Sequence, residues 1–201
     1  MNKDILICGV GGQGTVLASK IIAASAMDEG NIVHSAETIG MAQRGGSVTS
    51  HIRIGNTAYS PLIPFGSAGL LLAFEPAEAV RNLKYLSKDG TTIVNTTPTM
   101  PVTEALKNTG YNGSEMIYYL KSKCSCIFVN AEEVCIPFGS TKFFNIIMIG
   151  IAAGSEKLGI SKKTILKQIS ANVPAKFVEI NEKAFMTGFE IGSAKVEEGK
   201  K

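Results

Sequence analysis

The chain has 201 residues, of which 45% are hydrophobic and 18% are charged. That length suffices for one or at most two domains, and the composition supplies a core and excludes an intrinsically disordered chain. Lysine and arginine number 20 against 17 aspartates and glutamates, and the net charge of +3 is too weak to indicate nucleic-acid binding. The low charged fraction also predicts an unusually apolar surface, as a subunit would have.

Neither a membrane span nor a signal peptide is expected. The longest apolar stretches, 68–74 and 146–154, fall short of the roughly 18 residues that cross a bilayer. Glycines interrupt residues 1–14, where a signal peptide needs a continuous apolar run. We therefore expect a cytoplasmic protein.

The chain opens with a predicted βαβ unit. Asp4–Cys8 has the apolar, β-branched character of a strand, and glycines 9–14 then mark a turn. Helical periodicity runs over 15–27, and 32–36 follows as a second strand. A unit of about 30 residues is long enough for a right-handed crossover between two parallel strands.

Strand and helix patterns then alternate to about residue 135. Further strands are expected at 47–54, with a turn at Gly55-Asn56 leading to a possible hairpin strand at 58–59, and at 69–74, 91–95 and 124–129. The pattern predicts helices over 76–86 and 114–123, with an Asp89-Gly90 turn between the first helix and the strand after it. After Pro137 the pattern is helical, with helices over 143–153 and 161–173.

This order predicts an α/β fold: a doubly wound, largely parallel, Rossmann-like sheet with a helical C-terminal segment. We expect a single domain over 1–201, with the βα-alternating part at about 1–135 and the helical part at about 136–194.

The glycine turn allows two interpretations. Gly9, Gly11 and Gly14 form a Gly-x-Gly-x-x-Gly pattern between a strand and a helix, the context of a dinucleotide site. Glu37 lies 23 residues beyond Gly14, a loose match to the acidic residue that binds ribose in such sites. Alternatively, the glycines only permit a tight turn and close packing of the helix on the strand.

A second glycine loop, Met41-Ala42-Gln43-Arg44-Gly45-Gly46, is less generic. The Arg44 guanidinium offers a planar fork of donors suited to carboxylate or phosphate, and the glycines let backbone approach a ligand or partner. An arginine in such a loop is also often a solvated surface charge.

The cysteines and histidines do not suggest a metal site. Cys124 and Cys126 are separated by one residue, a poor spacing for zinc or iron–sulfur ligation, and alternation places them on one strand face as small hydrophobes. His34 and His51 lie in different expected strands. The motifs of serine hydrolases, P-loop proteins and zinc proteases are lacking, so the chain shows no complete catalytic set.

The expected helix over 143–153 is apolar on nearly all sides. Gly150 and Gly154 lie four apart on it and let another backbone approach. Such a helix belongs either to the core or to an interface. Because an absent partner could cover apolar surface, we also expect the isolated chain not to remain a monomer, with a homodimer as one outcome.

Taken together, Gly9-Val10-Gly11-Gly12-Gln13-Gly14 and the run from Gly40 to Gly55 resemble the gamma subunit, or gamma domain, of the 2-oxoacid:ferredoxin oxidoreductases. Within that family the residues are most similar to the beta-subunit branch of the indolepyruvate enzymes. The resemblance extends over nearly the whole chain in length and order.

The resemblance implies a non-catalytic subunit of a heteromeric complex that oxidatively decarboxylates a 2-oxo acid, of indolepyruvate or pyruvate type, with coenzyme A and ferredoxin. Thiamine diphosphate, magnesium and iron–sulfur clusters would be held by the partner subunit. The loop of Gln43, Arg44, Gly45 and Gly46 is similar to one that faces the neighbouring catalytic subunit and the coenzyme A side of the site. With the glycine turn, the candidate cofactor-binding residues are Gly9, Gly11, Gly12, Gln13, Gly14, Gln43, Arg44, Gly45 and Gly46. The rival reading is a free-standing NAD(P)-binding Rossmann dehydrogenase.

Overall fold

The computed structural model describes residues 2–39, 45–56, 58–100 and 110–199. Within them, six strands form one sheet in the order β2-β3-β1-β4-β5-β6. The strands are β1 (Lys3–Val10), β2 (Val33–Ile39), β3 (Ser47–Ile54), β4 (Ala68–Ala73), β5 (Leu86–Asn95) and β6 (Ser125–Val129). β3 runs antiparallel to both β1 and β2, whereas β1, β4, β5 and β6 pair in parallel.

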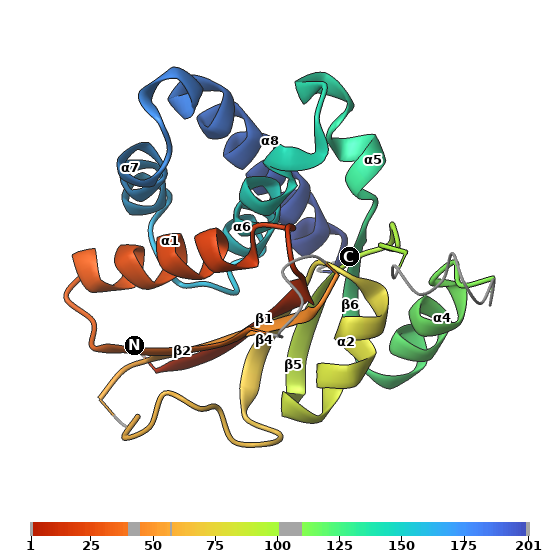
Figure 1. Cartoon of the computed structure of the whole chain (residues 1–201). Coiled ribbons are helices and arrows are strands. Elements are labelled where there is room, and N and C mark those ends of the chain that lie inside the picture. Colours follow the sequence, from red (N-terminus) through yellow and green to blue (C-terminus); the bar gives the residue numbers. More distant parts are fainter. Residues whose placement is uncertain (1, 40–44, 57, 101–109, 200–201) are drawn as a thin grey trace.

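Helices cover both faces of this sheet (Figure 1). On one face lie α1 (Thr15–Asp28), α6 (Phe144–Gly154), α7 (Lys162–Asn172) and α8 (Val178–Gly199), and on the other lie α2 (Pro76–Asn82) and α4 (Ser114–Lys123). The short helix α5 (Ala131–Val134) follows β6. The larger core lies between the sheet and the first group of helices, and a smaller core lies under α2 and α4. The predicted doubly wound α/β fold with a helical C-terminal segment is confirmed.

The order of the first three strands differs from the simplest reading of the βαβ unit. β1 and β2 run in the same direction, as expected, but β3 lies between them and pairs with both. The reason is the length of the connection: only residues 40–46 separate β2 from β3, fewer than the dozen or so that a parallel crossover needs, so the two strands pair antiparallel. The expected hairpin strand at 58–59 is wrong, because β3 has its partners in β1 and β2 and residues 58–67 form a loop.

Two boundaries on the α2 side also differ from expectation. The helix predicted to Leu86 ends at Asn82 and continues as a 3-10 turn over Leu83–Tyr85. The Asp89-Gly90 turn is wrong: both residues lie inside β5, where the pairing with β4 shifts register between Ala68 and Leu70. A Cβ on Gly90 would lie 2.8 Å from the Ala68 carbonyl oxygen, so glycine permits this irregular pairing rather than a turn.

The α6 helix is buried on nearly every side by this chain itself. A Cβ added to Gly150 would lie 2.2 Å from the Phe185 carbonyl oxygen, and one added to Gly188 would lie 2.1 Å from that of Ile147. The backbone that approaches the glycine face is therefore α8, and the core interpretation of this helix is confirmed. The expected exposed apolar surface does not come from α6.

Two expected helix starts are confirmed, whereas α4 has Gly113 and not Ser114 at its N-cap. Ser161 caps α7, accepting a hydrogen bond from the Thr164 amide, and α1 begins at Thr15 after Gly14 in the left-handed conformation. Across the described ranges, no helix combines the length and the apolar character that crossing a membrane requires.

Candidate functional site

The glycine turn lies between two neighbouring strands whose following helices pack on opposite faces of the sheet. The chain leaves β1 toward α1 on one face and leaves the neighbouring β4 toward α2 on the other. In open α/β sheets such a switch point, at the carboxyl ends of the strands, is the usual place for a ligand crevice. Two clefts flank the turn at this edge, with volumes of about 330 and 390 Å³.

Gln13 closes the turn through its side chain. Its Oε1 accepts from the Val10 amide at 2.8 Å, and its Nε2 donates to the Phe74 carbonyl and the Thr99 hydroxyl, both at 3.0 Å. A Cβ on Gly9 would lie 2.5 Å from that Oε1, so Gly9 makes room for the amide. The predicted site residue Gln13 therefore ties β1 to the end of β4.

Glycine is needed at two other positions of the turn for different structural reasons. Gly14 adopts a φ of +78°, and a Cβ there would lie 2.6 Å from the Asn145 Nδ2 at the start of α6. Gly12 adopts a φ of +100° with open space around its Cα, and it lines the first cleft. Gly12 is thus the glycine of the turn at which backbone lies open to a ligand or partner.

The two glycine motifs meet. The Gly11 amide donates to the Gly46 carbonyl at 2.9 Å, and the Gly45 amide donates to the Gly11 carbonyl at 3.5 Å. Gly45 also lines the second cleft. Gln43 and Arg44 lie outside the described residues, so their predicted role stays a prediction.

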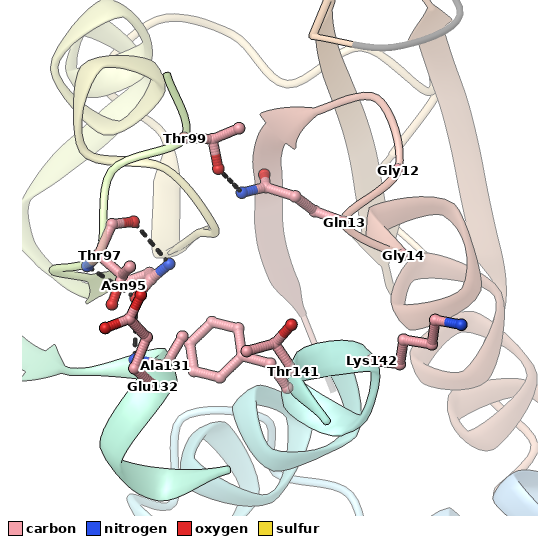
Figure 2. A pocket seen from close by; sticks show the side chains of 11 residues that line it. Gly12, Gln13, Gly14, Asn95, Thr97, Thr99, Ala131, Glu132, Thr141 and Lys142 are labelled. Carbon is pink, nitrogen blue, oxygen red and sulfur yellow. Dashed lines mark hydrogen bonds between the residues drawn. The ribbon is translucent and has the colours of Figure 1, made fainter. Parts of the chain in front are cut away.

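The first cleft, shown in Figure 2, is lined by polar side chains from several elements. Asn95, buried at the end of β5, donates to the Phe74 and Thr97 carbonyls and accepts from the Ala131 amide at 3.2 Å. Glu132 and Lys142 are exposed on its rim. Hydroxyls, amides and one ammonium group can bind an anionic or polar group by hydrogen bonds and charge.

The second cleft contains two buried carboxylates that sequence reasoning missed. Glu75 caps α2 by accepting from the Glu78 amide at 3.0 Å, and it accepts from the Tyr111 hydroxyl at 2.5 Å. Glu78 accepts from the Ser47 hydroxyl at 2.7 Å and pairs with Arg81. Burial, and then the hydrogen bond to Glu75, raise the pKa of Tyr111. The acidic start of the helix over 76–86 was the available signal.

Asn95 and Lys142 were also missed. A polar residue that ends a buried parallel strand marks the carboxyl edge of the sheet, so Asn95 carried a usable signal. Lys142 lies in a 3-10 turn before α6, and its arrival beside the glycine turn depends on the packing of α6 on α1.

Glu37 does not lie where a ribose-binding acid would. It is exposed on β2 and pairs with Ser50 of β3. Because β3 separates β2 from β1, Glu37 lies two strand spacings, about 10 Å, from the β1 line. The ribose contact of a dinucleotide fold requires the acid on the strand next to β1, so this part of the fingerprint is not assembled.

His51, Cys8 and Cys135 are buried side chains that line neither cleft. His51 is buried and accepts from the Ile63 amide through Nδ1 at 3.2 Å, and burial lowers its pKa. Burial, and then the charges of Glu78 and Glu75, raise the pKa of Cys8, and burial raises that of Cys135 to about 11. In the part of the chain that the structure describes, no three His, Cys, Asp or Glu side chains form a metal-binding group.

Comparison with known proteins identifies the family of the chain. Residues 4–191 match the model of the family described as pyruvate ferredoxin/flavodoxin oxidoreductase. The chain is 36% identical over 191 residues to the indolepyruvate oxidoreductase subunit IorB of Methanothermobacter thermautotrophicus, covering 94% of this chain and 97% of the relative. It is 38% identical to IorB of Archaeoglobus fulgidus, covering 94% of each.

The fold is similar to a solved structure as well. The gamma subunit of a keto/oxoacid ferredoxin oxidoreductase from Geobacter sulfurreducens superimposes with a TM-score of 0.70 over 96% of this chain and 99% of that one, at 24% identity. The chain belongs to the pyruvate ferredoxin/flavodoxin oxidoreductase family.

Proposed function

We propose that this chain is the non-catalytic subunit of an indolepyruvate-type 2-oxoacid:ferredoxin oxidoreductase, with the carboxyl edge of its sheet facing the catalytic subunit. The observation that carries the proposal is the pairing of Gly11 with Gly45 and Gly46, which joins the two motifs of the family resemblance at the mouths of the clefts. Two relatives that are 36% and 38% identical to this chain are indolepyruvate oxidoreductase subunits by name.

In this proposal the complex decarboxylates and oxidises a 2-oxo acid, transfers the acyl group to coenzyme A and passes electrons to ferredoxin. Thiamine diphosphate, magnesium and the iron–sulfur clusters belong to the partner. The distribution of the cysteines supports this division, because Cys8, the Cys124 and Cys126 pair, and Cys135 lie apart and lack the spacing of cluster ligands.

The role of the edge follows from its chemistry. The first cleft offers Lys142, the open backbone at Gly12 and several hydroxyls, groups that bind phosphate or carboxylate. We therefore propose that this edge, together with the Gln43–Arg44 segment, contacts coenzyme A or an acidic group of the catalytic subunit.

A free-standing NAD(P)-dependent dehydrogenase has less support. The Gly11 amide is used by Gly46, Gln13 fills the turn from within, and Glu37 lies beyond β3. Each of these removes one element of a dinucleotide site.

The test is to purify the chain alone and with the product of the neighbouring gene, and to assay both with coenzyme A and a viologen acceptor. Indolepyruvate and pyruvate serve as substrates, and NAD as a control acceptor. Activity only after mixing, and higher kcat/KM for indolepyruvate, is the expected result. Oxidation by the isolated chain with NAD would contradict the subunit assignment, and a preference for pyruvate would contradict the substrate.

The contact surface has its own test with a matched pair of variants. Lys142→Glu reverses a charge at the first cleft, whereas Lys163→Glu makes the same change on α7, on an exposed side chain that lines none of the clefts described above. We expect Lys142→Glu to raise the KM for coenzyme A or the Kd for the partner by roughly fivefold, about 1 kcal/mol, and Lys163→Glu to leave both unchanged. Equal effects of the two variants would refute the placement of the contact.

A further inference from the structure

Two thiols lie side by side on the outer strand of the sheet, away from both clefts. Cys124, between α4 and β6, and Cys126, in β6, place their Sγ atoms 3.4 Å apart on the side of the sheet under α4. Both side chains are partly exposed, whereas the other two thiols, of Cys8 and Cys135, are buried.

We propose that Cys124 and Cys126 form a reversible dithiol–disulfide site that is oxidised by a low-molecular-weight disulfide such as glutathione disulfide. The site is independent of the proposed function, and it would modify this subunit itself. The residues involved are outside the glycine motifs and the cleft linings.

The geometry permits the bond and makes it labile. Ser125, which separates the two cysteines, is the first residue of β6, so the two Cα atoms of the Cys-x-Cys segment are separated by roughly 6.4–6.8 Å, two strand rises. This separation lies at the upper end of the range that disulfides span, about 4.4–6.8 Å. A disulfide at that limit is strained, and strained disulfides are the ones that thiols reduce readily.

The surroundings allow the required adjustment. Within the described residues β6 is the last strand of the sheet and pairs only with β5, so its outer edge can move without breaking a second ladder. The Cys124 thiol donates to the Leu120 carbonyl and contacts the Thr92 hydroxyl, both at 3.5 Å. Lys121 and Lys123, in the last turn of α4, add positive charge that attracts anionic glutathione disulfide.

The reaction is an ordinary two-step exchange. The Cys124 thiolate attacks one sulfur of glutathione disulfide, and the displaced glutathione thiolate leaves and is protonated. Cys126 then loses its proton to solvent and attacks the Cys124 sulfur, releasing the second glutathione. The protein gives up two electrons and two protons, and one glutathione disulfide becomes two glutathione thiols.

The protonation of Cys126 sets the order of these steps. Burial, and then the hydrogen bond and charge of Cys124, raise the pKa of Cys126 to about 12. Once Cys124 is in the mixed disulfide, its charge and its hydrogen bond with Cys126 are gone and only burial remains. Cys126 therefore acts as the resolving thiol, after Cys124 has reacted.

The test uses the full chain, incubated with glutathione disulfide at pH 8, denatured in acid and alkylated with N-ethylmaleimide. We expect reduced protein to take up four maleimides and oxidised protein two, with a loss of two hydrogens confined to the peptide that holds Cys124 and Cys126. Dithiothreitol should restore all four. Cys126→Ser should instead retain one glutathione on Cys124, and Cys135→Ser should still form the cross-link.

Three results would overturn the proposal. They are four maleimides after oxidation, a stable glutathione adduct on wild-type Cys124, and a cross-link that involves Cys8 or Cys135. The measurement is by mass, so it does not depend on activity, and circular dichroism of each variant before oxidation verifies that it is folded.

Discussion

Replacing Gln13 by alanine separates a structural role from a ligand-binding one. The change removes the acceptor of the Val10 amide and the donor to Phe74 and Thr99. The Phe74 carbonyl keeps its hydrogen bond from Asn95, and the exposed Thr99 hydroxyl is satisfied by water. The loss therefore concentrates on the Val10 amide, which is buried at the end of β1.

A buried amide left without a partner costs about 1–3 kcal/mol. In a chain of this size each kcal/mol shifts the melting temperature by roughly 2–4 °C. In urea titration of the isolated Gln13→Ala chain, we expect the free energy of unfolding to fall by about 1–3 kcal/mol, with an unchanged m-value. The matched control is Thr99→Ala, which deletes only the exposed partner and should stay within about 0.5 kcal/mol.

The reasoning is refuted if Gln13→Ala unfolds at the wild-type urea concentration but no longer assembles with the catalytic subunit. In that case the amide would serve a ligand or partner, and the intrachain hydrogen bonds would contribute nothing measurable. Loss of stability and of assembly together, with assembly restored at low temperature, would agree with a structural role.

Three further predictions concern separate parts of the molecule. Gly188→Ala places a Cβ 2.1 Å from the Ile147 carbonyl oxygen and should destabilise the chain by about 1–3 kcal/mol in urea, although alanine favours helix; a gain in stability would contradict the close crossing. Burial lowers the pKa of His51, so the unfolded chain binds a proton more readily than the folded chain does. The free energy of unfolding should therefore fall as the pH drops below about 6.5. In His51→Gln this part of the dependence of the unfolding free energy on pH should vanish. Arg44→Lys keeps the charge but loses the bidentate fork, so in the reconstituted complex the KM for coenzyme A or the partner Kd should rise roughly 10- to 150-fold, about 1.5–3 kcal/mol; wild-type values for both would assign the arginine to the solvated surface.

The fold could be predicted from sequence wherever local pattern and tertiary context agree. Periodicity located β1, α1, α4 and β6, and the buried run at 69–74 corresponds to β4. The placement of β3 between β1 and β2 could not be predicted, because it depends on which distant strand β3 pairs with. The length of the connection, residues 40–46, is a signal for antiparallel pairing of β2 and β3 that sequence reasoning did not use.

Part of the candidate site could likewise be predicted from the sequence, and part could not. The glycine turn was recognisable because a strand, its glycines and a helix are contiguous in sequence. The contact of Gly11 with Gly46, the approach of Lys142 and the burial of Glu75 and Glu78 are products of packing between segments far apart in the chain. No local spacing encodes them.

The glycine-lined crossing of α6 and α8 also bears on how the chain reaches its folded state. During synthesis α6 leaves the ribosome before α8, and until α8 arrives the apolar side of α6 that faces α8 is uncovered, although α1 and β5 contact other parts of the helix. Nascent chains stopped at Asn172 would carry this exposed apolar side and should depend on chaperones or aggregate. The solubility of the newly synthesised subunit therefore depends on completion of α8.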